Sequence, residues 1–251
     1  MLSIVLIGSG NVAVQLAKNL QKANHVKLLQ RYSRSVKNTE YFDKTIPVTN
    51  NLKKLKEADL FIIAISDDAI TSVSKELQVS KGLVVHTSGN KPLSSLICKA
   101  NKGVFYPVQT FSKEKEISFD QIPICIETEH TDDMDLLKYF ANSMSKKIYE
   151  INSQQREKLH IAAVFANNFT NHMFAIADDI CRKNDVSFDI LKPLIQETAK
   201  KVKFISPKDA QTGPAVRNNL KVIENQLRQL DHNEKEIYSL ITKSIIESYN
   251  S

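Results

Sequence analysis

The sequence predicts an α/β domain with a mostly parallel sheet, followed by an all-helical domain. Short apolar runs alternate with amphipathic stretches as far as residue 151, and helical periodicity takes over from residue 153. A length of 251 residues with 42% hydrophobic and 25% charged residues is typical of one large or two ordinary folded domains. We therefore expect a first domain over residues 1–151 and a helical domain over residues 152–251.

The first part of the chain has the pattern of βαβ units. Several runs are apolar at consecutive positions, as in strands covered on both faces, and the stretches between them fit right-handed crossover helices. The predicted strands are residues 3–7, 26–30, 60–65, 83–86 and 104–106, with 122–126 and 147–151 at one edge. The predicted helices are residues 12–22, 52–58, 69–77 and 132–144, then 153–183, 187–205, 214–230 and 233–249.

A glycine-rich turn follows the first predicted strand. Gly8, Gly10 and Ala13 fit the G-x-G-x-x-G/A pattern of a Rossmann-like domain, in which the second glycine lets the backbone approach a pyrophosphate. The start of the next helix would add unpaired N–H groups and a positive dipole end. A tight turn without a ligand is the alternative. The residues expected to hold a cofactor here are Gly8, Ser9, Gly10, Asn11, Val12 and Ala13.

The end of the second predicted strand indicates which dinucleotide binds. An NAD site usually carries Asp or Glu there to accept a hydrogen bond from the ribose, whereas this chain has Ser33 and Arg34. A guanidinium binds a 2′-phosphate through charge-assisted hydrogen bonds, so the pair favours NADP. An exposed polar loop is the alternative.

Polar residues also follow the next two strands, where open α/β sheets bind their ligands. Ser66 is expected to line the cofactor site, and Ser88 is a second candidate for cofactor binding. His86 is placed to meet the nicotinamide or the substrate. Simple turn or capping roles are equally open for these residues.

The long predicted helix from residue 153 carries a polar stripe. At 100° per residue His160, Asn167 and Asn171 lie within about 20° of one line, and Asn168 lies about 80° from His160. Histidine titrates near neutral pH, so His160 is a candidate general acid, and Asn168 or Asn171 could orient a substrate oxygen. A structural hydrogen bond from His160 is the alternative.

Arg217 is expected in the first turn of the helix predicted over residues 214–230. A cation there opposes the helix dipole, so it could be kept to bind an anionic substrate group or a partner subunit. A solvated arginine is the alternative.

Taken together in this order, these motifs resemble a family of two-domain Rossmann-like NADP oxidoreductases related to pyrroline-5-carboxylate reductase and to deazaflavin-dependent NADP reductases. The resemblance covers nearly the whole chain through GSGNVA, the Ser-Arg pair, AISDDAI, VVHTSG, FYPVQTF, HIAAVFANN and TGP with Arg217. It implies substrate-binding positions at Tyr106, Gln109 and Arg217. The chain departs from many relatives at Tyr106, where they carry histidine, and at Asn218 and Asn219, where they carry Gly-Asp.

Charge, hydropathy and cysteine spacing argue against nucleic-acid binding, membrane insertion and metal binding. The net charge of +6 comes from scattered Lys and Arg, which indicates a solvated surface rather than nucleic-acid binding. No membrane span or signal peptide is apparent, and three cysteines without metal-ligand spacing predict free thiols and no metal site. The chain is thus expected to be cytoplasmic.

We expect an NADP(H)-dependent oxidoreductase that acts on a small carbonyl or imine substrate in the crevice between the two domains. The helical domain is expected to form a homodimer. The alternative is a non-catalytic NADP(H)-binding regulator or sensor.

Overall fold

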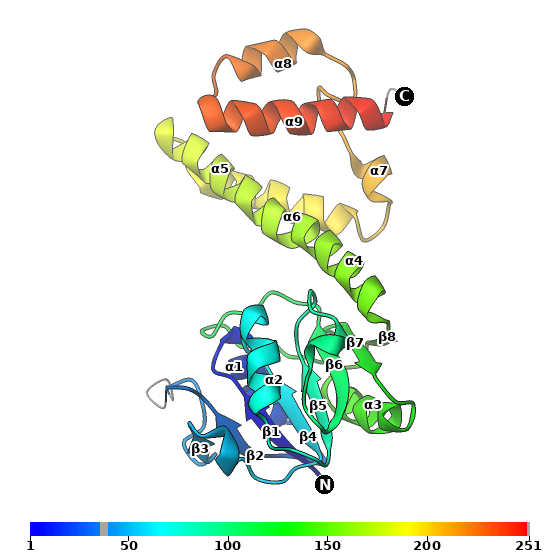
Figure 1. Cartoon of the computed structure of the whole chain (residues 1–251). Coiled ribbons are helices and arrows are strands. Elements are labelled where there is room, and N and C mark those ends of the chain that lie inside the picture. The colour runs from blue at the N-terminus through cyan, green and yellow to red at the C-terminus, as the bar shows by residue number, and fades with distance from the viewer. Residues whose placement is uncertain (36–39, 250–251) are drawn as a thin grey trace. The chain divides into compact units, whose positions relative to one another are not determined.

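The computed structural model of the chain describes residues 1–35 and 40–249 and divides into two compact units, with the division between Asn168 and Phe169 (Figure 1). The predicted domain boundary after residue 151 marks the change from strands to helices, which is a different criterion. As a functional boundary it stays a prediction. Within the described residues, no helix is long and apolar enough to cross a lipid bilayer.

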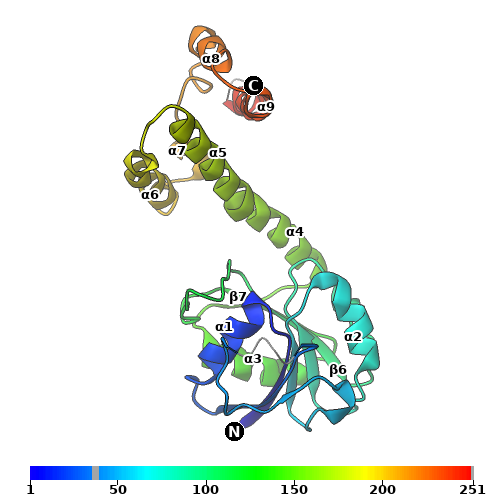
Figure 2. The same cartoon turned by 90° about the vertical axis from the view of Figure 1, so that its left-hand side faces the viewer.

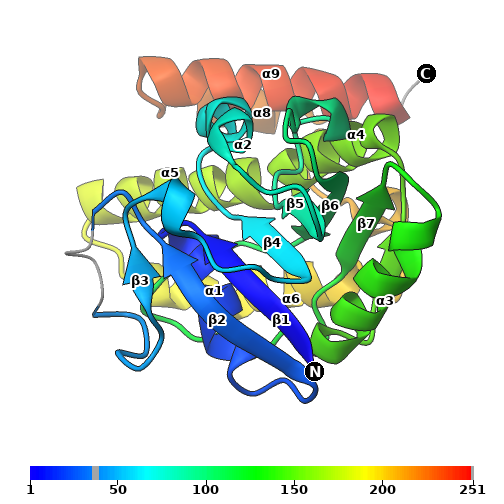
Figure 3. The same cartoon turned by 60° about the horizontal axis from the view of Figure 1, so that its bottom comes forward.

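The first unit is built on one sheet (Figure 3). Over the part of the chain that is described, its eight strands lie in the order β3-β2-β1-β4-β5-β6-β7-β8. Neighbouring strands are parallel except for the antiparallel pair β6 and β7. The first six follow the Rossmann order, which confirms the predicted fold class. The strands are β1 (Leu2–Ile7), β2 (Val26–Tyr32), β3 (Val48–Thr49), β4 (Leu60–Ile63), β5 (Leu83–His86), β6 (Asn101–Pro107), β7 (Ile124–Thr128) and β8 (Ile148–Glu150).

Helices cover both faces of this sheet (Figure 2). Alternate residues of the central strands enter two separate cores, as the period of a strand requires. One core joins Leu6 to α1 (Asn11–Leu20) and α3 (Asp132–Met144), and the other joins Ile63 to α2 (Ile70–Glu76). The consecutive apolar positions in β1 and β4 are therefore explained by burial on both faces.

One local prediction for the first unit was wrong, and one strand was missed. The helix predicted over residues 52–58 is a single 3-10 turn, η1 (Leu52–Lys54), in which only Leu52 is buried. With one buried side chain, so short a segment gains too little from packing to offset the cost of helix nucleation. The two-residue strand β3 was not predicted, because a pair of residues has no readable periodicity.

Helices follow β8 throughout the described part of the chain. Helix α4 (Ser153–Ala163) belongs to the first unit and continues into a π-helical segment, η4 (Val164–Phe169). The second unit contains α5 (Thr170–Lys183), η5 (Phe188–Leu191), α6 (Lys192–Lys201), α7 (Pro207–Ala210), α8 (Leu220–Leu227) and α9 (His232–Tyr249).

The helix predicted over residues 214–230 starts late. Residues 214–218 form a turn, Asn218 has a φ of 49°, and the Asn219 side chain caps α8 by accepting from the Val222 N–H. A left-handed residue cannot continue a helix, so α8 begins only at Leu220.

Candidate functional site

The glycine-rich turn joins β1 to α1 in the predicted way. Gly8 has a φ of +141°, and an ideal Cβ on it would lie 2.0 Å from the Ala64 carbonyl oxygen. Any side chain here would force β1 and β4 apart. Gly8 is therefore required by the fold itself.

Gly10 differs from Gly8 because it faces open space. It is the N-cap of α1 with a φ of −77°, which any residue can adopt, and no heavy atom lies within 4 Å of an ideal Cβ. Gly10 has no side chain, so no N-cap side chain accepts from the first N–H groups of α1. That arrangement fits an approaching anion, such as the pyrophosphate of a dinucleotide.

A hollow of about 700 Å³ lies in front of this turn, and we call it the N-terminal pocket. Its volume is in the range of about 300–1,000 Å³ that small-molecule sites occupy. Ala13, by contrast, is fully buried beneath the turn, as its packing role requires. The predicted cofactor residues that line the pocket are Gly8, Ser9, Gly10, Asn11, Val12, Ser33, Arg34 and Ser66, and they are joined by Leu52, Ala69, Ser72, Val73 and Glu76 among others.

The end of β2 presents Ser33 and Arg34 to this pocket in different ways. Ser33 is buried, its N–H donates to the Thr49 carbonyl at 3.0 Å, and its hydroxyl donates to the Ser35 carbonyl at 2.8 Å. Arg34 is exposed. Because Arg34 is exposed, its guanidinium can meet a phosphate at this end of the pocket.

His86, the last residue of β5, and Ser88, two residues later, lie away from the pocket lining. His86 is fully buried, and its Nδ1 accepts from the Ser88 N–H at 3.2 Å. Burial, followed by the nearby Arg156 charge, lowers the pKa of His86 to about 4, so the ring is neutral at pH 7. The Ser88 hydroxyl accepts from the backbone of Asn90 and Lys91. These contacts favour the turn-forming alternative for both residues over contact with a ligand.

The carboxyl end of β6 meets α4 through a tyrosine–histidine pair. The Tyr106 hydroxyl lies 3.1 Å from Nδ1 of His160, and the two rings meet edge to face with centroids 6.0 Å apart. Tyr106 is 9% exposed, and burial raises the pKa of its hydroxyl, which stays protonated at neutral pH. His160 is only partly buried. The predicted residues Tyr106 and His160 are therefore brought together.

Gly89 makes room for this pair. An ideal Cβ on Gly89 would lie 2.6 Å from Nδ1 of His160 and 2.6 Å from Cζ of Tyr106. Gly89 follows β5, the neighbour of β6 in the sheet. The pair thus stands at the same carboxyl edge of the sheet as the N-terminal pocket, where open α/β sheets hold their ligands.

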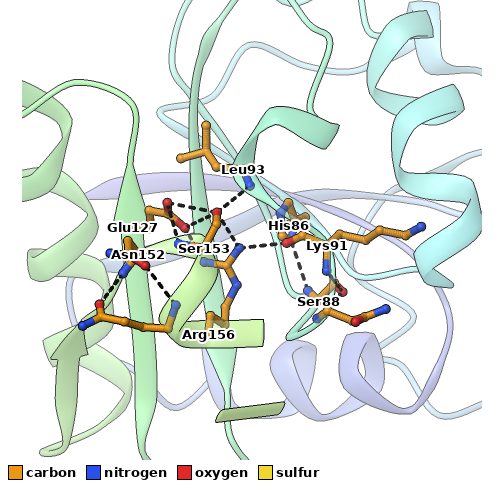
Figure 4. A network of polar contacts seen from close by, with 10 residues as sticks. His86, Ser88, Lys91, Leu93, Glu127, Asn152, Ser153 and Arg156 are labelled. Atoms are coloured by element: carbon orange, nitrogen blue, oxygen red, sulfur yellow. Dashed lines mark hydrogen bonds and ion pairs between the residues drawn. The ribbon is translucent and has the colours of Figure 1, made fainter. Parts of the chain in front are cut away.

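Sequence reasoning missed a buried arginine beside this pair. Arg156 is 1% exposed and forms an ion pair with Glu127 on β7, while its Nη2 donates to the Lys91 carbonyl at 2.8 Å (Figure 4). The segment SQQREKLH that contains it has the composition of a solvated helix face. The readable signal was the capping box of Asn152 and Gln155, which fixes the start of α4 at Ser153, about two turns before His160.

The roles predicted for the other catalytic and substrate-binding residues stay predictions. The π-helical segment η4 breaks the spacing of 100° per residue, so the predicted stripe of His160, Asn167 and Asn171 was wrong as geometry. Asn167, Asn168 and Asn171 are exposed, and Asn171 belongs to the second unit. Gln109 is exposed, and its side chain accepts from the Thr110 N–H.

Arg217 also differs from its prediction. It is exposed and lies in the turn before α8 rather than in a first helical turn, so the helix-dipole argument for it was wrong. Among the described residues no group of three His, Cys, Asp or Glu side chains could hold a metal ion.

Comparison with known proteins places this site in a family. Residues 3–88 match the family described as "NADP oxidoreductase coenzyme F420-dependent", and residues 122–245 match a domain of unknown function, DUF2520. The solved structure of a Bacteroides fragilis protein assigned as an NADP oxidoreductase is 39% identical over 98% of each chain, with a TM-score of 0.89. The chain belongs to this NADP oxidoreductase family.

More distant structures share the fold of this oxidoreductase. A Thermotoga maritima protein is 19% identical over 99% of this chain and 100% of its own, with a TM-score of 0.74. The NADP-bound pyrroline carboxylate reductase of Plasmodium falciparum is 16% identical over 98% of each chain, with a TM-score of 0.64. No curated protein sequence matches.

The predicted family, the enzyme class and the cofactor NADP are confirmed by these matches. The family assignment also favours the enzyme over the non-catalytic regulator.

Proposed function

We propose that this oxidoreductase reduces a small carbonyl or imine compound with NADPH, and that the Tyr106–His160 pair supplies the proton. The observation that carries this proposal is the 3.1 Å contact between the Tyr106 hydroxyl and Nδ1 of His160 at the carboxyl edge of the sheet. Reduction of a C=O or C=N bond needs a hydride on carbon and a proton on the heteroatom. When bound, NADPH supplies the hydride.

The residues of the N-terminal pocket fit the rest of the cofactor. The open backbone at Gly10 and the uncapped start of α1 would bind the pyrophosphate, with Ser9, Asn11 and Val12 around them. Arg34, beside the buried Ser33, would bind the 2′-phosphate. Ser66 lines the pocket on the β4 side.

The pair is suited to general acid catalysis. Because burial keeps the Tyr106 hydroxyl protonated, it can donate to a developing oxyanion or to an amine nitrogen. His160 shares the hydroxyl hydrogen bond and is partly exposed, so its ring can return a proton from solvent to the phenolate. His86 is fully buried and would act only on the shape of the turn.

A screen of NADPH oxidation against cyclic imines, ketones and aldehydes tests the function directly. In the responding class, Tyr106→Phe and His160→Gln should lower turnover by about 10²–10⁴-fold, the range of a general acid, with NADPH binding retained. Tyr139→Phe and His130→Gln are matched controls, because both side chains are half exposed or more. Full turnover in both test variants would refute the proton-transfer roles.

We also propose that the second unit forms a homodimer, with a second copy of the chain as the partner. Among its described residues only Ala215 and Ile223 are buried apolar side chains, whereas Leu194, Phe204 and Leu240 are 62%, 77% and 71% exposed. Helices with so little apolar burial are stable only when another surface covers them. Light scattering should give a dimer that Phe204→Glu with Leu240→Glu weakens, and a monomeric parent chain would contradict the proposal.

A further inference from the structure

A buried guanidinium ties the start of α4 to two other parts of the first unit (Figure 4). Nη1 of Arg156 pairs with Glu127 on β7, and Nη2 donates to the Lys91 carbonyl at 2.8 Å and to the Ser153 hydroxyl oxygen at 3.1 Å. Of the three guanidinium nitrogens of Arg156, Nε is the one without a hydrogen-bond partner among the described residues. One side chain thus connects a helix, a strand and the loop after β5.

Ser153 completes the connection. Its hydroxyl lies 2.9 Å and 3.0 Å from the two Glu127 carboxylate oxygens and accepts from the Leu93 N–H at 2.9 Å. Its own backbone N–H donates to Glu127 at 3.0 Å. The first turn of α4 is therefore held by side-chain and backbone contacts on two sides.

The three connected elements are those that surround the tyrosine–histidine pair. His160 follows Arg156 by one helical turn on α4. Gly89, whose missing side chain leaves room for the pair, precedes Lys91 in the loop. Tyr106 lies on β6 directly opposite Cys125 of β7, the strand that also carries Glu127. A shift of α4 relative to this loop or strand would change the Tyr106–His160 distance.

Stability alone does not require a buried ion pair at this place. Removing two charges from water costs several kcal/mol, and well-packed apolar side chains of similar volume often serve as well or better. The Arg156 charge also opposes the rise that burial causes in the pKa of Tyr106. Both points indicate a role beyond packing.

We propose that the Arg156–Glu127 ion pair positions His160 against Tyr106, which makes Arg156 a positioning residue for proton transfer. This rests on the proposed function, since it assigns a role within the same site. Arg156 itself touches neither member of the pair through a hydrogen bond in the described residues.

Nitrogen NMR of the histidine ring in the full chain separates positioning from mere folding. In the parent protein, Tyr106→Phe should shift the Nδ1 resonance of His160, which is assigned by its loss in His160→Gln. Arg156→Lys keeps the positive charge but loses the planar guanidinium that holds α4 in place. In a protein that carries Arg156→Lys, adding Tyr106→Phe should therefore leave the Nδ1 resonance of His160 unmoved. Arg182→Lys, in an exposed ion pair with Asp179, is the matched control and should preserve the Tyr106→Phe shift.

Kinetics give the second readout. Arg156→Lys should lower kcat by about tenfold or more, with little change in KM or NADPH binding, because only a transition-state interaction is weakened. If this variant does not fold, Glu127→Gln removes the negative partner of Arg156, and it should reduce the same NMR shift. An unchanged Tyr106→Phe shift in the Arg156 or Glu127 variant overturns the proposal.

The NMR result distinguishes this proposal from the function on which it rests. If the parent chain shows no NADPH-dependent turnover, the proposed reductase function is refuted. The ring resonance would still report whether Arg156 sets the Tyr106–His160 contact.

Discussion

Gly10→Ala separates what the glycine-rich turn does for a ligand from what it does for the fold. An added Cβ meets no heavy atom within 4 Å, and the φ of −77° suits alanine. Alanine is a poorer N-cap residue than glycine, which lowers the free energy of unfolding, but it also makes the unfolded chain less flexible, which raises it. Each effect is about 1 kcal/mol or less. The free energy of unfolding should therefore change by about 1 kcal/mol at most.

The same methyl group should strongly affect NADPH, because it points to where the pyrophosphate is expected. Losing one charge-assisted hydrogen bond costs about 1.5–3 kcal/mol, which weakens binding by about 10- to 150-fold. Thermal unfolding and a titration of NADPH fluorescence measure the two effects. Parental NADPH affinity in a folded Gly10→Ala protein would refute the placement of the phosphates.

Gly8→Ala is the contrasting variant. Its Cβ would lie 2.0 Å from the Ala64 carbonyl oxygen at a φ of +141°. Strain and overpacking of this kind each cost about 1–3 kcal/mol, so this variant should lose stability even without nucleotide. Equal stability of the two variants would contradict the distinction between them.

Three further predictions concern the two ends of the site and its buried histidine. Arg34→Glu should weaken NADPH binding by about tenfold or more and NADH binding far less, because only NADPH carries the 2′-phosphate; equal losses in a competition titration would contradict this. Gly89→Ala places a Cβ 2.6 Å from Nδ1 of His160, so it should lower the free energy of unfolding by about 1–3 kcal/mol and reduce turnover, and parental values for both would count against the packing described. The free energy of unfolding of the parent, relative to that of His86→Leu, should fall by about 1.4 kcal/mol per pH unit as the pH falls from 6.5 to about 4. In this range the unfolded chain binds a proton at His86 and the folded chain does not. A difference in urea unfolding that stays constant with pH would argue against a buried neutral ring.

Local patterns were enough to predict the parallel sheet and the glycine-rich turn. Strands buried on both faces and the spacing of Gly8, Gly10 and Ala13 depend on neighbouring residues alone. Helix α3 was predicted with its observed bounds, as the segment between two predicted strands. Three acidic residues in its first turn and buried apolar residues along its length agree with that helix.

The contacts of the candidate site depend on residues far apart in sequence. Tyr106 and His160 are separated by 54 residues and Glu127 and Arg156 by 29, so no periodicity reports that they meet. The asparagine stripe was wrong because the spacing assumed an uninterrupted α-helix, which η4 is not. Arg217 was placed in a helix because the left-handed backbone at Asn218 was not predicted from the neighbouring residues.

Equilibrium titration of the parent chain with NADPH and with NADH tests the central claim most directly. If the N-terminal pocket binds the pyrophosphate at Gly10 and the 2′-phosphate at Arg34, NADPH should bind saturably and more tightly than NADH by about tenfold or more. Binding of NADH as tight as NADPH, or no saturable binding of NADPH, would contradict it.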